Sequence, residues 1–246
     1  MLRIDGLTIG SGAARIVGDV AFDLPEGRVT CLIGPSGCGK TSVVKWLAGV
    51  LAAPLAAEGR LTLDGARIMP PDRAIAYQPQ QDALFPWLTV AENAALGLSV
   101  RGMSRGAARA KVLPLFASFG LDGTEDAFPA SLSGGMRQRA AFLRTIVQDS
   151  RFVLLDEPFS ALDAVTRLTM QDWLAARLAE RPRGILMVTH DLHEATQMAD
   201  RILVMGRRPG RIVADIPIDT PRGERTEAGL AEVRTSLKTR LMEQTP

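Results

Sequence analysis

The sequence predicts an α/β fold with a mostly parallel sheet, an antiparallel β subdomain near the N-terminus and an inserted α-helical subdomain. Continuous apolar runs at Val29–Ile33, 152–155 and 185–188 are typical of strands that are buried on both faces in a parallel sheet. Short alternating runs fill the first quarter of the chain, as in antiparallel strands. From about residue 86 to residue 148 the periodicity is helical instead.

The elements follow in this order along the chain. Alternating apolar residues predict strands at 2–4, 20–24 and 61–63, the last of them before the turn Asp64-Gly65. Helical patterns come next, and the last central one places Met136, Ala140, Leu143 and Val147 on one face. The predicted helices cover residues 41–50, 90–98, 105–119 and 135–147.

A short amphipathic helix is predicted near the C-terminus, where Leu230, Val233, Leu237 and Leu241 recur at helical spacing. We expect one domain over residues 1–220, with its core in 1–85 and 149–220 and a helical lobe in 86–148. The remaining residues, 221–246, form a C-terminal helical tail.

Composition limits the function classes. A chain of 246 residues with 46% apolar residues can bury a large core. The net charge of +2 and the lack of a basic run argue against a nucleic-acid partner. The two cysteines, Cys31 and Cys38, suit neither a disulfide nor a metal set, which favours a reducing compartment. The longest apolar stretch, 47–57, is too short to span a bilayer and contains Pro54, so we expect a soluble or peripheral protein.

A glycine-rich loop follows the predicted strand Val29–Ile33 and precedes a predicted helix, which is the context of a phosphate-binding loop, or P-loop. Glycines let successive backbone amides point at phosphate oxygens, and the helix N-terminus adds positive potential. Lys40 can bind the β- and γ-phosphates, and the Thr41 hydroxyl can bind Mg²⁺. We therefore expect a RecA-like nucleotide-binding core that binds ATP or GTP through Gly34, Pro35, Ser36, Gly37, Cys38, Gly39, Lys40, Thr41 and Ser42.

Two other predicted strands end in polar residues. One runs into Asp156-Glu157 and the other into Thr189, His190 and Asp191, and ligands collect at the carboxyl ends of parallel strands. An Asp there can hold Mg²⁺, and a neighbouring Glu can orient and deprotonate an attacking water. Taken alone, Asp156-Glu157 could instead cap a following helix, but the P-loop favours the catalytic interpretation.

A second glycine-bearing helix start lies at Leu132-Ser133-Gly134-Gly135. A serine hydroxyl and glycine amides at a helix N-terminus can bind an anion. The same residues could equally form an ordinary helix cap. Two phosphate-binding helix starts in one chain are nevertheless unusual.

Taken together, these motifs resemble those of the ATP-binding subunits of ABC transporters, over essentially the whole chain. Besides the P-loop, Gln80 in Tyr77-Gln78-Pro79-Gln80 is similar to the family's glutamine loop. The family's remaining motifs have counterparts in the same order. These are the signature motif at Leu132, Ser133, Gly134 and Gly135, the second carboxylate motif ending in Asp156 and Glu157, the loop Ser160, Ala161, Leu162 and Asp163, and the switch histidine at His190.

The resemblance implies a head-to-tail homodimer that holds two ATP molecules at its interface. Each ATP would lie between the P-loop of one subunit and the segment from Ser133 through Gly134 to Gly135 of the other. Glu157 would be the general base, and His190 would sense the γ-phosphate. Asp163 would link the two sites. Asp156, Thr41 and Gln80 would contact the magnesium ion and the water.

One departure from the family pattern concerns the base. The family usually stacks an aromatic residue on adenine, whereas counting back from the P-loop gives Ser11 at that place, with no aromatic residue nearby. Ile16 or Val17 could make an apolar contact instead. We therefore expect weak discrimination of ATP from GTP.

The chain lacks predicted membrane spans, so transport requires separate permease subunits. The resemblance places the permease contact at residues 81–90, from Gln81 to Val90, where Phe85 and Trp87 suit an interface. Core packing of these two aromatic residues is the alternative.

The residues around this segment and His190, together with Arg208-Pro209-Gly210, resemble the nitrate, sulfonate and taurine branch of bacterial importers. This implies a periplasmic solute-binding protein as an indirect partner and a peripheral location on the cytoplasmic face of the inner membrane. An exporter subunit or a soluble ABC ATPase outside transport is the alternative.

Overall fold

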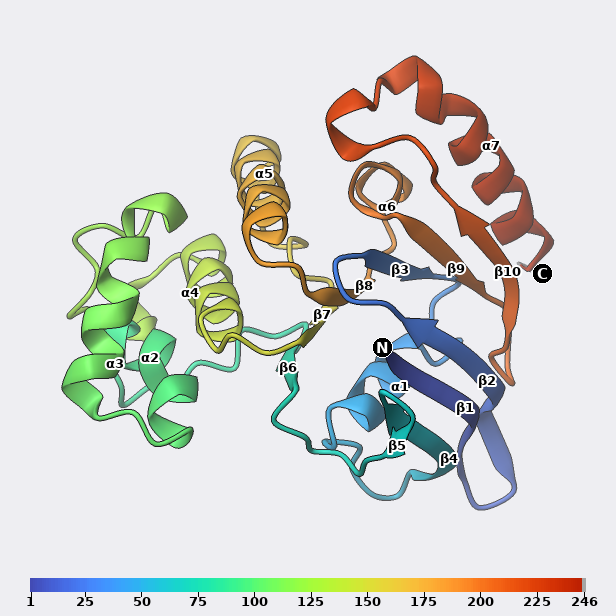
Figure 1. The fold of residues 1–246 in the computed structure, drawn as a ribbon, viewed down its shortest axis with the longest axis horizontal. Helices are drawn as coiled ribbons and strands as arrows, with labels where there is room; N and C mark the ends of the chain where they lie inside the picture. Colours follow the sequence, from blue (N-terminus) through green and yellow to red (C-terminus); the bar gives the residue numbers. More distant parts are fainter. Residues whose placement is uncertain (245–246) are drawn as a thin grey trace.

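The computed structural model describes residues 1–244, which form two β-sheets with helices around them (Figure 1). A four-stranded sheet has the order β2-β1-β4-β5 and a six-stranded sheet has the order β10-β9-β3-β8-β7-β6. The first consists of β1 (Leu2–Ser11), β2 (Ala14–Leu24), β4 (Ala56–Leu63) and β5 (Ala66–Arg67). The second consists of β3 (Val29–Ile33), β6 (Ile75–Gln78), β7 (Phe152–Asp156), β8 (Gly184–Val188), β9 (Arg201–Met205) and β10 (Ile212–Pro217).

The six-stranded sheet is parallel from β9 to β6, and only β10 at its edge is antiparallel. All residues of β3, β7 and β8 are buried, as the continuous apolar runs predict. β3 lies between β9 and β8, so the loop that leaves its carboxyl end emerges at the middle of the sheet. The predicted α/β fold class is confirmed.

The four-stranded sheet is antiparallel throughout, as predicted. Its strands are longer than the alternating runs indicate, because β1 continues to Ser11 and β2 begins at Ala14. Irregular pairing between Ile4 and Leu7 interrupts the alternation, and Gly6 lies there with a φ of 61°. An irregularity of this kind hides a strand from a search for strict period-two patterns.

The helices include α1 (Lys40–Leu47), α2 (Val90–Val100), α3 (Arg105–Val112) and α4 (Gly134–Ile146). The last three form a lobe that stands beside the sheets in Figure 1. The helix predicted over 105–119 is wrong in its second half, where 3₁₀ turns at Leu113–Leu115 and Ala117–Phe119 follow α3. Pro114 lacks the N–H that would continue the α-helix.

The buried apolar residues form two clusters, on opposite faces of the large sheet. Along β3, Val29, Cys31 and Ile33 belong to the cluster that includes the lobe, whereas Leu32 belongs to the cluster shared with α1 and the small sheet. Phe142 of α4 packs edge-on against Phe159, with ring centroids 5.4 Å apart. The helix face predicted for α4 is confirmed: its members at 140, 143 and 147 are buried and the one at 136 packs against them.

The remaining helices are α5 (Ala164–Glu180), α6 (Leu192–Met198) and α7 (Glu227–Glu243). The amphipathic face predicted near the C-terminus is correct, because Leu230 and Leu237 are buried while Val233 and Leu241 pack beside them. α7 lies alongside α6 and ends near β9 and β10 (Figure 1). Over residues 1–244, no helix has the length and apolar character needed to cross a membrane.

Candidate nucleotide-binding and hydrolysis site

The P-loop joins β3 to α1, and its backbone requires glycine just before α1 begins. Gly39 is the N-cap of α1 in the left-handed region, with φ 105°, and Gly37 has φ 77°. A Cβ atom on Gly39 would come within 2.6 Å of a Val17 methyl carbon. A side chain there would therefore both strain the loop and displace the β2 strand.

Lys40 is the first residue of α1, and its ammonium is held by the loop itself. The Nζ atom donates to the carbonyl oxygen of Gly34 at 2.8 Å and to that of Pro35 at 3.0 Å. Nucleotide phosphates would compete with these neutral acceptors, and charge-assisted hydrogen bonds are the stronger kind.

Asp156 ends β7 beside the start of α1, where the Thr41 hydroxyl donates to its Oδ1 atom at 3.2 Å. Its other carboxylate oxygen, Oδ2, is buried and has no hydrogen-bond partner within residues 1–244. Burial is the main cause that raises the pKa of Asp156, and the Thr41 hydrogen bond opposes it. A buried carboxylate with a free oxygen beside a hydroxyl suits a cation.

These residues fit Mg²⁺ in particular. The described part of the chain has no group of three or more His, Cys, Asp or Glu side chains placed to hold a metal. Mg²⁺ does not need one, because it is commonly bound through one or two carboxylates together with substrate phosphates and water. Asp156 and Thr41 would supply the protein ligands at the P-loop.

Glu157 lies between Gln80 and His190, the two other residues predicted to act in hydrolysis. Gln80 Nε2 donates to Glu157 Oε2 at 3.0 Å, and His190 Nδ1 lies 3.3 Å from Glu157 Oε1. The structure thus brings together three motifs that are far apart in the sequence. Glu157 has a φ of 50°, a conformation that costs a non-glycine residue of order 1 kcal/mol and often marks a functional position.

The alternative interpretation of Asp156-Glu157 as a helix cap is wrong. Asp156 belongs to β7, and the next helix begins at Ala164 with Asp163 as its N-cap. The Asp163 carboxylate accepts from the backbone N–H of Thr166 at 3.0 Å, and the hydrogen bonds to Thr166 lower the pKa of Asp163.

Gln138 is a site residue that the sequence analysis missed. It is buried on α4, where its Nε2 donates to the Glu157 carbonyl at 3.2 Å and its Oε1 accepts from Ala161 N–H at 2.9 Å. It therefore holds the backbone on both sides of Ser160. Helical periodicity offered no signal for it, because position 138 lies on the side of the helix opposite the predicted apolar face.

Ser133 is the N-cap of α4 and accepts from the Met136 N–H at 3.2 Å. Among residues 1–244, no hydrogen bond or ion pair joins the segment 133–135 to the P-loop. α4 belongs to the lobe, while α1 lies against the sheets (Figure 1). The second helix start is thus not part of the same chain's P-loop site.

Two apolar residues of β2 lie beside the P-loop. Ile16 and Val17 of β2 both lie against Gly39, at 3.3 and 2.6 Å from the position of its missing Cβ. Ser11 ends β1 and pairs with Ala14 in the hairpin. The apolar pair suggested by the sequence is therefore adjacent to the P-loop.

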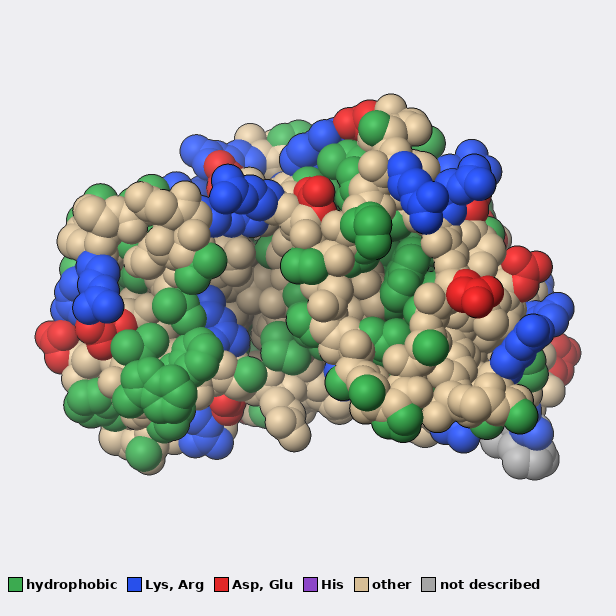
Figure 2. Space-filling model, turned by 90° about the horizontal axis from the view of Figure 1, so that it is seen from below, with side chains coloured by type: hydrophobic (Ala, Val, Ile, Leu, Met, Phe, Trp, Pro, Cys, Tyr) green, Lys and Arg blue, Asp and Glu red, His purple; other side chains and the backbone are tan. Residues whose placement is uncertain are grey.

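Phe85 and Trp87 are exposed by 39% and 69%, so the alternative that they pack in the core is wrong. Their rings contact each other at a tilt of 47°, with 5.2 Å between centroids. The lobe also exposes Val100 and Phe128, and the space-filling view shows apolar side chains gathered on it, with a hollow between lobe and core (Figure 2).

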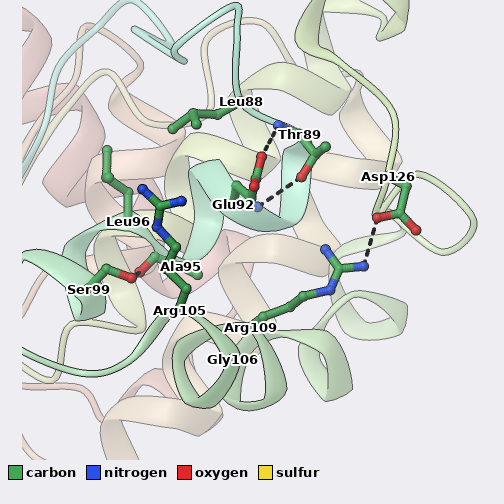
Figure 3. Close-up of a pocket in the computed structure, with 10 residues that line it drawn as sticks. All are labelled: Leu88, Thr89, Glu92, Ala95, Leu96, Ser99, Arg105, Gly106, Arg109 and Asp126. Carbon is green, nitrogen blue, oxygen red and sulfur yellow. Dashed lines mark hydrogen bonds and ion pairs between the residues drawn. The ribbon is translucent and has the colours of Figure 1, made fainter.

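A pocket of about 280 Å³ lies between α2 and α3 (Figure 3). Its lining includes Leu88, which follows Trp87 in the sequence. The lining also includes the apolar residues Ala95 and Leu96 together with Arg105 and Glu92. Arg109, also in the lining, is paired with Asp126 at 2.8 Å. The pocket thus combines apolar side chains with charged groups of both signs.

A P-loop on a parallel sheet, a buried aspartate beside it and a glutamate at the next position define a nucleoside-triphosphate hydrolase with an inserted helical lobe. The family model for the ABC transporter matches residues 17–160. The chain belongs to the ABC transporter family, as one of its ATP-binding subunits: it hydrolyses ATP to ADP and phosphate, with Mg²⁺.

Two curated relatives cover most of the chain. It is 38% identical to the taurine import ATP-binding protein TauB of Rhizobium johnstonii, over 90% of this chain and 86% of the relative. It is 40% identical to the aliphatic sulfonates import ATP-binding protein SsuB 1 of Xanthomonas axonopodis, over 91% and 88%. The resemblance to importers of this branch is confirmed.

Solved structures agree on the fold. A structure described as the ATP-binding subunit of an ABC transporter superposes with a TM-score of 0.77 at 26% identity, over 96% of this chain and 99% of that one. The dimeric cassette MJ0796, bound to ADP and Pi, superposes with a TM-score of 0.79 at 24% identity, over 90% of this chain and all of that one.

Proposed function

We propose that this chain is the ATPase subunit of a bacterial importer for a small anionic solute of the sulfonate, taurine or nitrate type, or for a pyrimidine or thiamine precursor. The observation that carries the ATPase role is the Glu157 carboxylate held between Gln80 and His190, next to Asp156. The import role is supported by the relatives named for taurine and sulfonate import. The ATPase domain would be residues 1–220, followed by the tail 221–246.

In the proposed reaction, ATP binds with its phosphates in the P-loop, and Lys40 exchanges its contacts with Gly34 and Pro35 for phosphate oxygens. Glu157 orients the attacking water and takes its proton as the water adds to the γ-phosphorus and ADP leaves. His190 stabilises the γ-phosphate. When bound, Mg²⁺ neutralises charge on the phosphates, and Asp156, Thr41 and Gln80 would hold it and its water shell.

The proposed active form is a head-to-tail homodimer. Ser133, Gly134 and Gly135 of one subunit would bind the ATP held by the P-loop of the other, with Asp163 at the same interface. Support comes from the separation of the two phosphate-binding helix starts within one chain, and from the dimeric cassette with the same fold. In such a dimer, the helix that starts at Ser133 in each subunit binds a phosphate of the ATP held by the partner's P-loop.

The proposed permease contact is the segment from Gln81 to Val90 together with the pocket between α2 and α3. Phe85 and Trp87 provide exposed aromatic anchors, and the pocket provides apolar lining residues together with Arg105 and Glu92. Arg144 of α4 donates to the carbonyls of Ala83 at 2.8 Å and Asp82 at 2.9 Å, so the segment is tied to the helix that begins at Ser133. The chain would sit peripherally on the cytoplasmic face of the inner membrane, with a periplasmic solute-binding protein as an indirect partner.

Glu157→Gln tests the ATPase role. Removing the general base is expected to lower kcat by about 100-fold or more while ATP binding persists. ATP should then trap a dimer, detected by size-exclusion chromatography with light scattering. Turnover at the wild-type rate in this variant would refute the assignment of Glu157.

Transport is tested by copurification with candidate permease subunits, and the complex is reconstituted in vesicles. Its ATPase should be stimulated by binding protein loaded with taurine, an alkanesulfonate or nitrate, and solute should accumulate inside. Efflux of solute instead of uptake would refute the import role, and no stimulation by any of these solutes would refute a substrate of the sulfonate, taurine or nitrate type.

A further inference from the structure

One guanidinium connects the two loops that flank Glu157. Arg167 of α5 donates through NH1 to Asp191 Oδ2 at 3.1 Å and through NH2 to the Leu162 carbonyl at 3.2 Å. Asp191 directly follows His190, and Leu162 directly precedes Asp163. A single side chain therefore fixes the spacing between the histidine loop and the loop that begins α5.

Asp191, the partner of Arg167, is itself held in place by hydrogen bonds. Asp191 is the N-cap of α6, and its Oδ1 accepts from the N–H groups of His193 at 2.8 Å and Glu194 at 3.2 Å. Its own N–H donates to the Thr189 hydroxyl at 3.1 Å. With one carboxylate oxygen on the helix and the other on Arg167, any shift of the guanidinium moves the backbone that carries His190.

Arg167 also lies beside the reacting groups. It lines a hollow of about 50 Å³ together with Glu157, Ser160 and His190. Its Nε atom is buried and has no hydrogen-bond partner in the described part of the chain. A buried donor without a partner is costly for an anchor that serves packing alone, and such groups tend to mark functional places.

We propose that Arg167 is a positioning residue: it holds His190 and the loop 160–163 at a fixed spacing around Glu157, and so sets the rate of the chemical step rather than the affinity for ATP. This inference rests on the proposed ATPase role of Glu157. It adds a residue that touches neither nucleotide nor Mg²⁺ in that scheme and acts through Asp191 and Leu162.

The test compares Arg167→Gln with a matched control on the same helix. Within residues 1–244, the partly buried Arg177 of α5 makes its one side-chain ion pair with Glu180, one turn along the helix, so Arg177→Gln removes an arginine without touching either loop. For Arg167→Gln, kcat of the full-length chain is expected to fall about 10- to 100-fold while KM for ATP stays within about two-fold, since small misplacements at a reacting centre have costs of this size. Arg177→Gln should keep the wild-type kcat.

Three further variants separate positioning from folding. Asp191→Asn keeps an N-cap acceptor for α6 but loses the charge that Arg167 contacts, so it should lower kcat as well. The double variant Arg167→Gln/Asp191→Asn should be no slower than Arg167→Gln alone, to within about two-fold, because both changes break one link. Arg167→Lys keeps the charge but loses the planar, two-armed guanidinium that contacts Asp191 and Leu162 together, so kcat should stay low.

The readouts distinguish this proposal from the ATPase assignment. In the Glu157→Gln background, Arg167→Gln should still give an ATP-dependent dimer, which shows a folded, ATP-binding chain. A wild-type kcat for Arg167→Gln, or a loss of kcat matched by an equal loss of folded protein, overturns the positioning role and leaves Glu157 untouched. A wild-type chain without ATPase activity overturns the proposed function itself.

Discussion

Gln80 donates a hydrogen bond to the carboxylate of Glu157, over a distance of 3.0 Å and across 77 positions of the sequence. Gln80 follows β6 and Glu157 follows β7, and these strands are neighbours in the sheet. His190 Nδ1 lies 3.3 Å from the other carboxylate oxygen, so a polar side chain faces each oxygen of Glu157. The carboxylate is thus held in one orientation, and this order depends on Gln80.

Gln80→Ala is therefore expected to lower kcat. Without the amide, Glu157 keeps only His190 as a side-chain partner, and a less ordered base reacts more slowly. We expect a fall of about ten-fold in kcat, with KM for ATP changed by less than about three-fold, in steady-state ATPase assays. A rise in KM with unchanged kcat would show that Gln80 contributes to binding alone.

Nucleotide preference is expected to be weak, because Ser11 offers no aromatic ring and the nearest apolar residues are Ile16 and Val17. Stacking on an aromatic side chain contributes roughly 1–3 kcal/mol per base, and apolar contact distinguishes adenine from guanine little. Competition binding should give dissociation constants for ATP and GTP within about three-fold of each other. Ile16→Ala should weaken both by a similar factor. A ten-fold or larger preference for ATP would contradict the prediction.

Much of the fold could be predicted because the parallel strands are buried on both faces. β3 begins and ends at the same residues as the apolar run that predicted it, because none of its residues faces solvent. The antiparallel strands were underestimated because their extent depends on pairing: β1 continues to Ser11 only because β2 and β4 pair with it. The end of α3 at Val112 was missed although Pro114 was the local signal.

The candidate site likewise contains residues that could be predicted from the sequence and residues that could not. The residues in motifs, such as Lys40 and Glu157, could be named because their chemistry requires particular residue types at fixed spacing. Gln138 and Arg167 act through partners on other elements, the carbonyls of Glu157 and Leu162. A single sequence carries no record of such pairings, so only the structure reveals them.

Glu194 is expected to make the free energy of unfolding depend on pH. It is buried on α6, and burial raises its pKa above the ordinary value of 4.5. Asp191 raises it further, whereas hydrogen bonds from Thr189 and Gln171 and the charge of Arg167 lower it. Because the pKa is higher in the folded state than in the unfolded state, the stability that Glu194 contributes is complete below about 4.5 and is lost as the pH rises through the raised pKa.

Glu194→Gln removes this titration while keeping the side-chain length. Urea unfolding at a series of pH values above 4.5 should therefore show that the variant gains free energy of unfolding relative to the wild type as the pH rises. The gain should level off once Glu194 is fully ionised. Parallel pH profiles for the two proteins would mean that Glu194 titrates normally, in spite of its burial.

The C-terminal tail is expected to contribute to stability through Arg225. Its side chain is 0% exposed and donates to the carbonyls of Thr196 at 3.1 Å and Gln197 at 2.6 Å, in the last turn of α6. Its NH2 atom lies 3.9 Å from Asp200, which also pairs with Arg222. A cation at the carboxyl end of a helix satisfies free carbonyls and the helix dipole together.

Arg225→Gln should lower the free energy of unfolding by about 2–4 kcal/mol in urea titrations, because it leaves buried carbonyls and part of the Asp200 charge without a partner. Arg240→Gln is the matched control, since this arginine is exposed near the end of α7 and should change stability by less than about 0.5 kcal/mol. If the two variants were equally stable, the tail would be held by the apolar face of α7 alone. Since Leu230 and Leu237 remain in both variants, the difference between them isolates the contribution of the buried guanidinium.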